Sequence, residues 1–143
     1  GKFVYNSFKE TEEILQHGKE YPYIITTNRE LEHYNCGAMT RRTGNEKILK
    51  EDYLMINPED AAKHLINEGD MVCVESARGK VDVRARITDE VKPGILSSTF
   101  HFPEIMMNNI TSDQSDSEAM CPEYKVVAVN IRKSKGKYKN AAV

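Results

Sequence analysis

Short runs of apolar residues, separated by turn residues, make up most of the hydrophobic pattern of this chain. The most regular run, residues 81–87, alternates apolar and polar positions, as a strand with one buried face does. Residues 71–76 are apolar until Glu75, which is typical of a strand buried on both faces. Further strands are predicted at residues 23–27, 53–56, 95–100 and 124–131. Because no regular βαβ alternation accompanies them, the pattern predicts a mainly β fold, a closed barrel with short helical insertions.

Helical signals are few, and the clearest lies in residues 57–66. Asn57 is a suitable N-cap, and Pro58 occupies the first helical position, where its missing N–H costs nothing. Gly69 is expected to end this helix. A short helical turn is predicted at residues 45–52. The positions of the 57–66 helix predicted to face the core are Ala61, Ala62, Leu65 and Ile66.

The two ends of the chain differ from its middle. Residues 1–20 are charged and weakly patterned, and they predict a linker or lead-in with one short helix at residues 8–17. Residues 133–143 are basic and low in apolar content, which predicts a flexible tail. The chain of 143 residues has the usual size of one domain and is long enough to bury a core without disulfides.

Two polar segments interrupt the strand pattern, at residues 30–43 and 101–123. Each begins where a predicted strand ends, which is a common position for binding groups. The second is long for an irregular segment in a small domain, and such segments are usually functional. We therefore expect these two segments to form the binding surface of the domain.

Charge and cysteine content exclude several functions. The chain has 20 Lys and Arg against 22 Asp and Glu, so no basic excess indicates nucleic acid. No apolar run reaches the length of a membrane span. Cys36, Cys73 and Cys121 are too far apart for a zinc knuckle, and their odd number argues against a disulfide scaffold. Unpaired thiols favour the cytoplasm over the periplasm.

No self-contained active site emerges from the polar residues. The chain has no glycine-rich phosphate loop, and its four histidines do not lie at metal-ligand spacing. His64 is expected on the surface of a helix. Cys36 follows His33 by three positions, but that spacing alone does not make a nucleophile, so packing is the expected role. Two interpretations of the polar segments stay open: a solvated surface, or a site for a nucleotide-like ligand with arginines on its phosphates.

Four ordered motifs resemble the C-terminal domain of molybdopterin-dependent oxidoreductases. They are NRELEHYNCGAMTRRT, LMINPEDAAKHLINEGDMVCVESARGKVDVRARIT, TFHFPEIMMNNITSD and CPEYKVVAVNI, and together they span most of the chain, residues 21–131. Catalytic subunits of formate dehydrogenases are the most similar members, followed by assimilatory and periplasmic nitrate reductases. The resemblance implies a six-stranded double-psi β-barrel of the aspartate-decarboxylase-like group at residues 21–132.

The resemblance also implies a cofactor. In this family the domain caps bis(molybdopterin guanine dinucleotide), while the ligand of the molybdenum or tungsten, the catalytic residues and an iron–sulfur cluster lie in other domains. The expected partners are the remaining domains of the catalytic subunit and the electron-transfer subunits, with no nucleic acid and no membrane contact by this domain. The domain alone is therefore expected to hold neither a catalytic residue nor a metal ligand.

Position by position, the resemblance assigns cofactor contacts to both polar segments. Arginine and loop amides would neutralise the diphosphate, and His, Asn, Tyr and Thr would hydrogen-bond the pterin rings. His33 has an alternative role in stabilising its own loop. The implied cofactor-binding residues are Thr27, Arg29, Glu30, His33, Tyr34, Asn35, Thr40, Arg41, His101, Asn108, Thr111, Tyr124 and Lys125.

Departures from the family pattern bear on the choice of member. Many nitrate-reductase-like members have a second histidine at the position of Asn35, which favours formate dehydrogenase. After Thr111 the family often has D-x-x-D-P, but here no proline occurs until Pro122, which leaves open the path after Asp113 and any contact from residues 115–120. Two other hypotheses are a double-psi barrel that binds a protein without a cofactor, and a decarboxylase-type enzyme. The latter would need a self-processing Gly-Ser dipeptide, and the chain has none.

Overall fold

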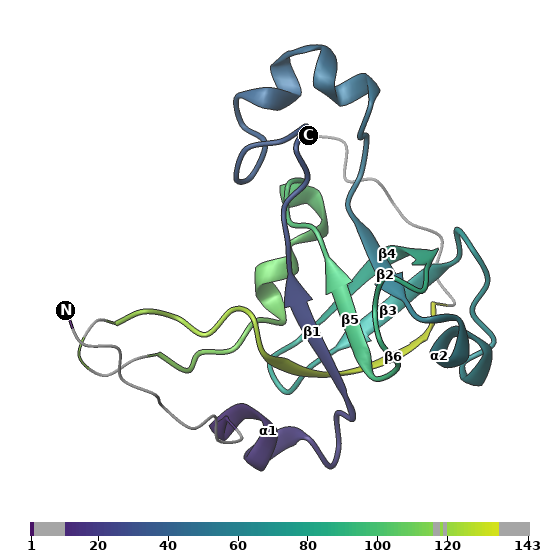
Figure 1. The fold of residues 1–143 in the computed structure, drawn as a ribbon, viewed down its shortest axis with the longest axis vertical. Coiled ribbons are helices and arrows are strands. Elements are labelled where there is room, and N and C mark those ends of the chain that lie inside the picture. Colours follow the sequence, from purple (N-terminus) through teal and green to yellow (C-terminus); the bar gives the residue numbers. More distant parts are fainter. Residues whose placement is uncertain (2–10, 116–117, 119, 135–143) are drawn as a thin grey trace.

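Six strands close into a barrel in the computed structural model, which describes residues 1, 11–115, 118 and 120–134. The strands are β1 (Tyr23–Thr27), β2 (Tyr53–Ile56), β3 (Met71–Glu75), β4 (Lys80–Ile87), β5 (Ile95–Ser98) and β6 (Val127–Lys133). Their order around the barrel is β1, β5, β2, β4, β3, β6 (Figure 1). The pairs β1–β5 and β2–β4 are parallel, and the other neighbours are antiparallel. The fold is the predicted double-psi β-barrel.

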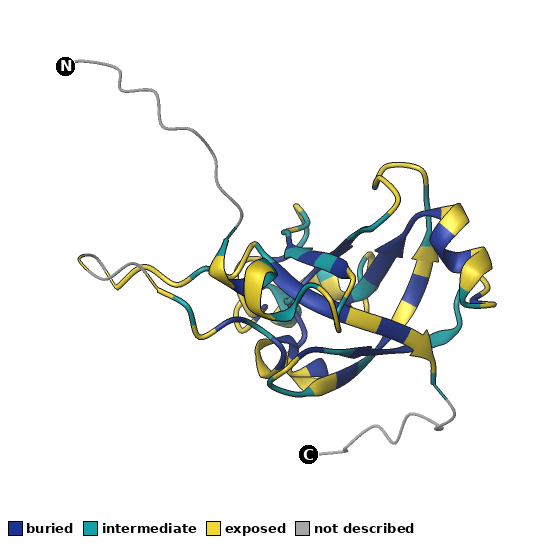
Figure 2. Cartoon of the chain, turned by 90° about the horizontal axis from the view of Figure 1, so that it is seen from below, coloured by how far each residue is buried: buried dark blue, intermediate teal, exposed yellow. Residues whose placement is uncertain are grey.

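Alternating apolar residues of the strands fill the barrel (Figure 2). In β4, buried Val81, Val83 and Ala85 alternate with exposed Arg84 and Arg86, as predicted. The three central residues of β3 are all buried, which confirms a strand covered on both faces. The core therefore forms from the period of the strands, and the side chains between them reach solvent.

The helix α2 (Pro58–Lys63) begins as predicted but ends early. The Asn57 side chain accepts the Glu59 N–H at 3.0 Å, as an N-cap does. After the last helical residue, Leu65 takes a left-handed backbone with φ of +53°, and the Ile66 N–H bonds back to the Ala61 carbonyl at 2.9 Å. This turn satisfies a free carbonyl at the helix end and stops the helix.

The early end of α2 corrects three predictions. Leu65 is 80% exposed, and Ala62 is also exposed, so neither faces the core. Gly69 lies beyond the end of the helix and does not terminate it. His64 is not a free surface residue, because its Nε2 lies 2.8 Å from the hydroxyl of buried Tyr23.

The lead-in segment contributes a helix that packs on the barrel. α1 (Glu12–His17) begins after Thr11, whose hydroxyl accepts the Ile14 N–H at 3.4 Å. The helix therefore starts at residue 12 and not at residue 8, and residues 8–10 lie outside the described range. Glu13 is fully buried against β6, where its carboxylate accepts the Ala128 N–H at 3.0 Å.

Two strands differ from their predicted bounds. β5 stops at Ser98 and not at residue 100, because the following residues turn toward Asp52. β6 starts at Val127 and continues to Lys133, whose Nζ lies 2.7 Å from Asp70 Oδ2. Residues 135–143 of the predicted tail lie outside the described range. Within that range, no helix is long and apolar enough to cross a membrane.

Candidate functional site

Both polar segments leave the barrel at the same end. β1 and β5 are parallel neighbours with Thr27 opposite Ser98, so the segments that follow them start side by side. The 28–52 loop forms the lobe at the top of Figure 1 and contains the 3₁₀ helices η1 (Thr40–Arg42) and η2 (Gly44–Lys47). The 99–126 loop contains η3 (Pro103–Ile105) and η4 (Met107–Asn109).

Asp52, the last residue of the 28–52 loop, holds the start of the 99–126 loop. Its side chain is fully buried. The carboxylate accepts the Thr99 hydroxyl at 2.5 Å and the N–H groups of His101 and Phe102 at 2.9 Å each. Because β2 begins at the next residue, Tyr53, this carboxylate is fixed relative to the barrel.

The ring of His101, in the 99–126 loop, makes hydrogen bonds to the 28–52 loop. It is fully buried, and its Nε2 accepts the Glu30 N–H at 2.9 Å. Nε2 therefore carries no proton, and Nδ1 donates to the Asn35 carbonyl at 2.6 Å. The neutral ring thus bridges two points of the opposite loop.

His33 is buried inside the 28–52 loop. Its Nε2 lies 2.9 Å from the Leu49 carbonyl and therefore donates to it, while Nδ1 lies 3.0 Å from the Thr40 hydroxyl. The same hydroxyl accepts the Tyr34 N–H at 3.2 Å. Both nitrogens of His33, like those of His101, are engaged within the chain. The geometry supports a role in holding the loops, and a direct cofactor contact of either ring stays a prediction.

Arg41 joins η1 to η3 across the two loops. Its guanidinium makes two hydrogen bonds with the Glu104 carboxylate, at 2.6 and 3.0 Å, and lies 4.8 Å from the centroid of the Phe102 ring. The hydrogen bonds from Arg41 hold the pKa of Glu104 below its ordinary value. Because both side chains are partly exposed, the ion pair contributes less than about 1 kcal/mol to stability.

Glu30 is tied to the base of its loop. The Tyr53 hydroxyl donates to the Glu30 carboxylate, and the Arg86 guanidinium lies 4.8 Å from the centroid of the Tyr53 ring. Burial and the hydrogen bond to Glu30 raise the pKa of Tyr53 to about 12. The phenol therefore keeps its proton at neutral pH and continues to donate it to Glu30.

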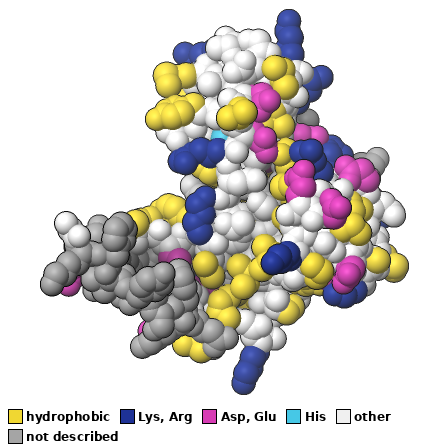
Figure 3. Space-filling model, viewed as in Figure 1, with side chains coloured by type: hydrophobic (Ala, Val, Ile, Leu, Met, Phe, Trp, Pro, Cys, Tyr) yellow, Lys and Arg dark blue, Asp and Glu magenta, His cyan; other side chains and the backbone are white. Residues whose placement is uncertain are grey.

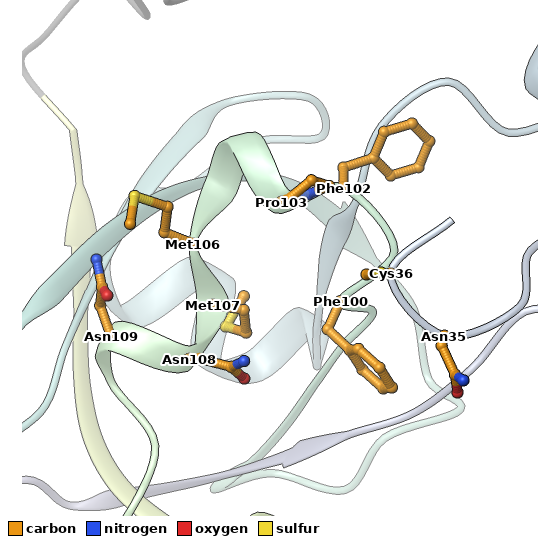
Figure 4. Close-up of a pocket in the computed structure, with 9 residues that line it drawn as sticks. All are labelled: Asn35, Cys36, Phe100, Phe102, Pro103, Met106, Met107, Asn108 and Asn109. Atoms are coloured by element: carbon orange, nitrogen blue, oxygen red, sulfur yellow. The ribbon is translucent and has the colours of Figure 1, made fainter. Parts of the chain in front are cut away.

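A pocket of about 420 Å³ opens between the two loops. Figure 4 shows Asn35 and Cys36 on one side, the residues of η4 on the other, and the Phe100 side chain between them. Phe100 and Met107 supply apolar surface, and the amides of Asn35 and Asn108 supply hydrogen-bonding groups. An apolar wall with a few polar groups is typical of a site for a flat heterocycle.

Several predicted site residues lie around this pocket. Asn35 and Asn108 line it directly. The guanidinium carbon of Arg29 lies 5.5 Å from the centroid of the Phe100 ring, and its Nη2 lies 3.4 Å from Asn35 Oδ1. The Thr111 hydroxyl donates to the Asn108 carbonyl at 2.9 Å, which fixes the end of η4.

The remaining predicted residues do not line the pocket. Thr27 is buried at the end of β1, and its carbonyl accepts a hydrogen bond from the Lys125 amine. Tyr34 and Tyr124 are exposed, and Thr40 is engaged with His33. The predicted set is thus brought to one end of the barrel, but only part of it faces the pocket. Among the described residues, no group of His, Cys, Asp and Glu is arranged as metal ligands.

Two residues that the sequence did not single out shape this site. Phe100 reaches the pocket because β5 stops two residues earlier, and an apolar residue at a predicted strand end gives no signal of this. Asp52 was overlooked because its partners, Thr99 to Phe102, are distant in sequence. A single acidic residue directly before an apolar strand was the available signal.

The stretch after Asp113, whose path the sequence left open, doubles back on itself. Ser115 pairs with Pro122 in an antiparallel bridge, and the Glu123 N–H bonds to the Gln114 carbonyl at 3.0 Å. Residues 116, 117 and 119 lie outside the described range, and no described residue of this stretch lines the pocket.

Gly37 is a position where the two loops approach closely. Its φ is +71°, and a Cβ added there would lie 2.8 Å from both the His101 carbonyl and Arg41 Cδ. Gly37→Ala is expected to lower the free energy of unfolding by about 1–3 kcal/mol, through backbone strain and this contact. Urea denaturation measures the effect.

Gly69→Ala is the matched control for Gly37→Ala. Its φ is +77°, but no atom lies within 4 Å of an added Cβ. Its cost is therefore limited to the backbone strain of about 1 kcal/mol. Equal losses for the two variants would show that the loops do not approach closely at Gly37.

The outer face of the 28–52 loop exposes apolar side chains. Leu31 is fully exposed, and Tyr34, Met39 and Ile48 are 61%, 68% and 70% exposed. Figure 3 shows apolar groups gathered on this upper lobe. Grouped apolar residues on a surface are typical of a contact with another protein surface.

Curated relatives match almost the whole chain. The F420-dependent formate dehydrogenase subunit alpha of Methanocaldococcus jannaschii is 40% identical over 93% of this chain and 20% of its own length. A similar subunit of Methanococcus maripaludis is 38% identical over the same shares of the two chains. The periplasmic nitrate reductase of Desulfovibrio desulfuricans is 34% identical over 80% of this chain and 15% of its own length. The chain therefore spans about a fifth of the length of the two formate dehydrogenase subunits.

A solved structure supports the fold. Acetylene hydratase from Pelobacter acetylenicus superposes with a TM-score of 0.71 over 82% of this chain and 19% of its own, at 17% identity. The model of the family described as "Molydopterin dinucleotide binding domain" matches residues 23–128, which include the barrel and both loops. This chain therefore belongs to the molybdopterin dinucleotide-binding domain family.

Proposed function

We propose that this chain is the cofactor-capping domain of a formate dehydrogenase catalytic subunit, and that the pocket between its two loops receives a polar ring of bis(molybdopterin guanine dinucleotide). The observation that carries the proposal is the pocket itself, which combines aromatic and thioether surface with the amides of Asn35 and Asn108. The likeness to formate dehydrogenase subunits over nearly the whole chain supports the choice of enzyme.

The residues at the pocket fit such a cofactor. The Oδ1 atom of Asn28 and the Nε atom of Arg41 are buried without a hydrogen-bond partner among the described residues. Both atoms belong to the 28–52 loop, which supplies Asn35 and Cys36 to the pocket, and an unsatisfied acceptor and donor suit a ligand with many polar edges. The exposed guanidinium of Arg29 adds a positive charge at the rim, where it can pair with a phosphate oxygen.

Four residues at the pocket have distinct parts in this proposal. Arg29 would bind the diphosphate, the amides of Asn35 and Asn108 would hydrogen-bond a ring, and Phe100 would pack against its face. When bound, the cofactor supplies a molybdenum or tungsten centre for two-electron redox chemistry. The chain itself would bind and orient the cofactor and exclude water from it.

The remainder of the enzyme is the proposed partner of the exposed lobe. Because the chain spans a fifth of its relatives, other domains would supply the metal ligand, the catalytic residues and the iron–sulfur cluster, and separate subunits would take up the electrons. The apolar outer face of the 28–52 loop would pack against those domains. The three free cysteines fit a reducing compartment such as the cytoplasm.

A nitrate-reductase-like enzyme is the second candidate. The periplasmic nitrate reductase match favours it, at 34% identity against 40% for the formate dehydrogenase subunit. Asn35 at the pocket, in place of the histidine of many nitrate reductases, supports the formate side.

Titration of the 143-residue chain with GDP, a fragment of the cofactor, tests the proposal. We expect amide chemical-shift changes clustered in residues 27–43 and 101–125, with a dissociation constant on the order of 1 mM. Asn108→Ala is expected to weaken GDP binding several-fold through loss of one hydrogen bond.

Controls separate ring recognition from charge. Asn67→Ala, an exposed amide remote from the loops, should leave GDP binding unchanged. ADP carries the same diphosphate on a different base, so equal shifts with ADP would indicate charge attraction alone. The absence of shifts with GDP would favour a barrel that binds a protein without a cofactor.

A further inference from the structure

We propose that Asp52 is a positioning residue that holds both loops in register across the pocket, so that cofactor binding depends on a carboxylate that does not touch the cofactor. The effect on binding rests on the proposed function. The effect on the loops themselves does not depend on the proposed function, and it can be measured without a ligand.

The burial and partners of Asp52 carry the inference. The side chain is fully buried, and its three hydrogen bonds come from one hydroxyl and two backbone N–H groups. All three donors belong to residues 99–102, the stretch that leads from β5 into the pocket wall. A buried carboxylate with this donor set fixes the backbone that surrounds it, because each lost bond leaves a buried group unsatisfied.

Hydrogen bonds also link residues 99–102 to the opposite wall of the pocket, which the 28–52 loop supplies. One of the two residues that donate a backbone N–H to Asp52 is His101, whose ring contacts the 28–52 loop at Glu30 and Asn35. Asn35 lines the pocket on one side, and Phe100 and Phe102, the neighbours of His101, line it too. A displacement of residues 99–102 would therefore move both walls, since one ring joins them.

Asp60 provides a matched control elsewhere in the same barrel. It is also buried, at 1% exposure, and its carboxylate accepts the Gly94 N–H at 2.6 Å and pairs with Lys63 at 2.8 Å. Neither partner belongs to the two loops. The two aspartates thus share burial and hydrogen bonding but differ in what they hold.

Asp52→Asn is the decisive variant. Asparagine keeps the shape of the side chain but replaces one acceptor oxygen with an NH₂ donor, which faces the donors of residues 99–102. We expect the amide resonances of Asn35 and Phe102 to shift in the ligand-free chain. The ¹⁵N shifts of the His101 ring should depart from those of an Nδ1-protonated tautomer, and the GDP dissociation constant should rise about tenfold.

Asp60→Asn should lower the melting temperature while leaving the His101 ring shifts and the GDP dissociation constant unchanged. If Asp52→Asn behaves in the same way as Asp60→Asn, Asp52 has a merely structural role and the proposal is wrong. All measurements are made well below the melting temperature of each variant, so that loss of stability does not enter the binding constant.

A second pair of variants covers the case in which Asp52→Asn does not fold. Thr99→Val keeps the shape of Thr99 but removes one donor to Asp52, and Thr99→Ser retains it. Thr99→Val should shift the amides of His101 and Phe102, and Thr99→Ser should restore them. Unchanged amides in Thr99→Val would overturn the proposal. If the parent chain fails to bind GDP, the proposed function fails, whereas the ligand-free shifts still decide the role of Asp52.

Discussion

Replacing Glu13 with glutamine is expected to lower the free energy of unfolding by about 3–5 kcal/mol, the usual cost of breaking a buried ion pair on one side. Glu13 is fully buried, and its two oxygens accept bonds from the Arg78 guanidinium at 2.6 and 3.0 Å. The same carboxylate accepts the Ala128 N–H and the Ser112 hydroxyl. Glutamine leaves Arg78 without its counter-charge and supplies only one acceptor oxygen to these donors.

Chemical denaturation of both proteins measures this loss. Glu12→Gln is the matched control, because Glu12 precedes Glu13 in α1 but is exposed. Its effect should stay within about 0.5 kcal/mol. A loss below about 1 kcal/mol for Glu13→Gln would mean that α1 does not bury this carboxylate against the barrel.

The contribution of Glu13 also depends on pH. Burial raises the pKa of Glu13, but the hydrogen bonds from Arg78 and Ala128 and the charge of Arg78 outweigh it, so the pKa lies below its ordinary value of 4.5. The folded state therefore binds the proton less tightly than the unfolded state does. The stabilisation is fully present above pH 4.5 and is lost as pH falls through the folded pKa. The difference in unfolding free energy between the parent chain and Glu13→Gln should shrink in that range.

Leu54→Ala is expected to lower the free energy of unfolding by about 2–5 kcal/mol. Leu54 lies in β2 at the centre of the barrel core, with no exposed surface. Its parallel partner is Ala85 of β4, and its antiparallel partner is Ser98 of β5. Truncation leaves a cavity. The neighbouring strands cannot move in to fill it, because hydrogen bonds hold both of them in the closed barrel.

Leu65→Ala makes the same substitution on the surface. Leu65 is 80% exposed, so its truncation should change the unfolding free energy by no more than about 0.5 kcal/mol. Thermal or urea denaturation of the two variants compares the sites directly. A large loss at Leu65 would place this residue in the core, as the apolar spacing of residues 57–66 predicted, and would contradict the early end of α2.

The site owes its shape to bonds within the chain. His33, His101 and Asp52 are polar and buried. The hydrogen bonds of His101 and Asp52 join the two loops, and those of His33 lie within the 28–52 loop. Asn35 and Asn108 line the pocket, the first with its carbonyl bonded to the His101 ring and the second with its carbonyl bonded to the Thr111 hydroxyl. Loops held by bonds of this kind are ordered without a ligand, so that the cofactor binding proposed above would not have to order them.

Local patterns predicted the strands because burial in a barrel follows a period of two. The alternation in residues 81–87 became β4, and the apolar stretch at residues 71–76 became β3. The N-cap Asn57 marked the start of α2, since capping depends only on neighbours in sequence. The predicted end of α2 was wrong. The helix stops where the chain turns to bury Ile66 in the core, and the spacing of apolar residues does not show this turn.

The sequence by itself determined the strands, the family motifs and the positions of the two polar segments, because these depend on residues close together along the chain. Only the tertiary structure decided which polar residues line the pocket. Parallel pairing of β1 with β5 brings two distant segments to one end of the barrel. There the hydrogen-bond partners of Asp52 and His101 lie tens of residues away in the sequence. Only the closed barrel brings these side chains within hydrogen-bonding distance of their partners.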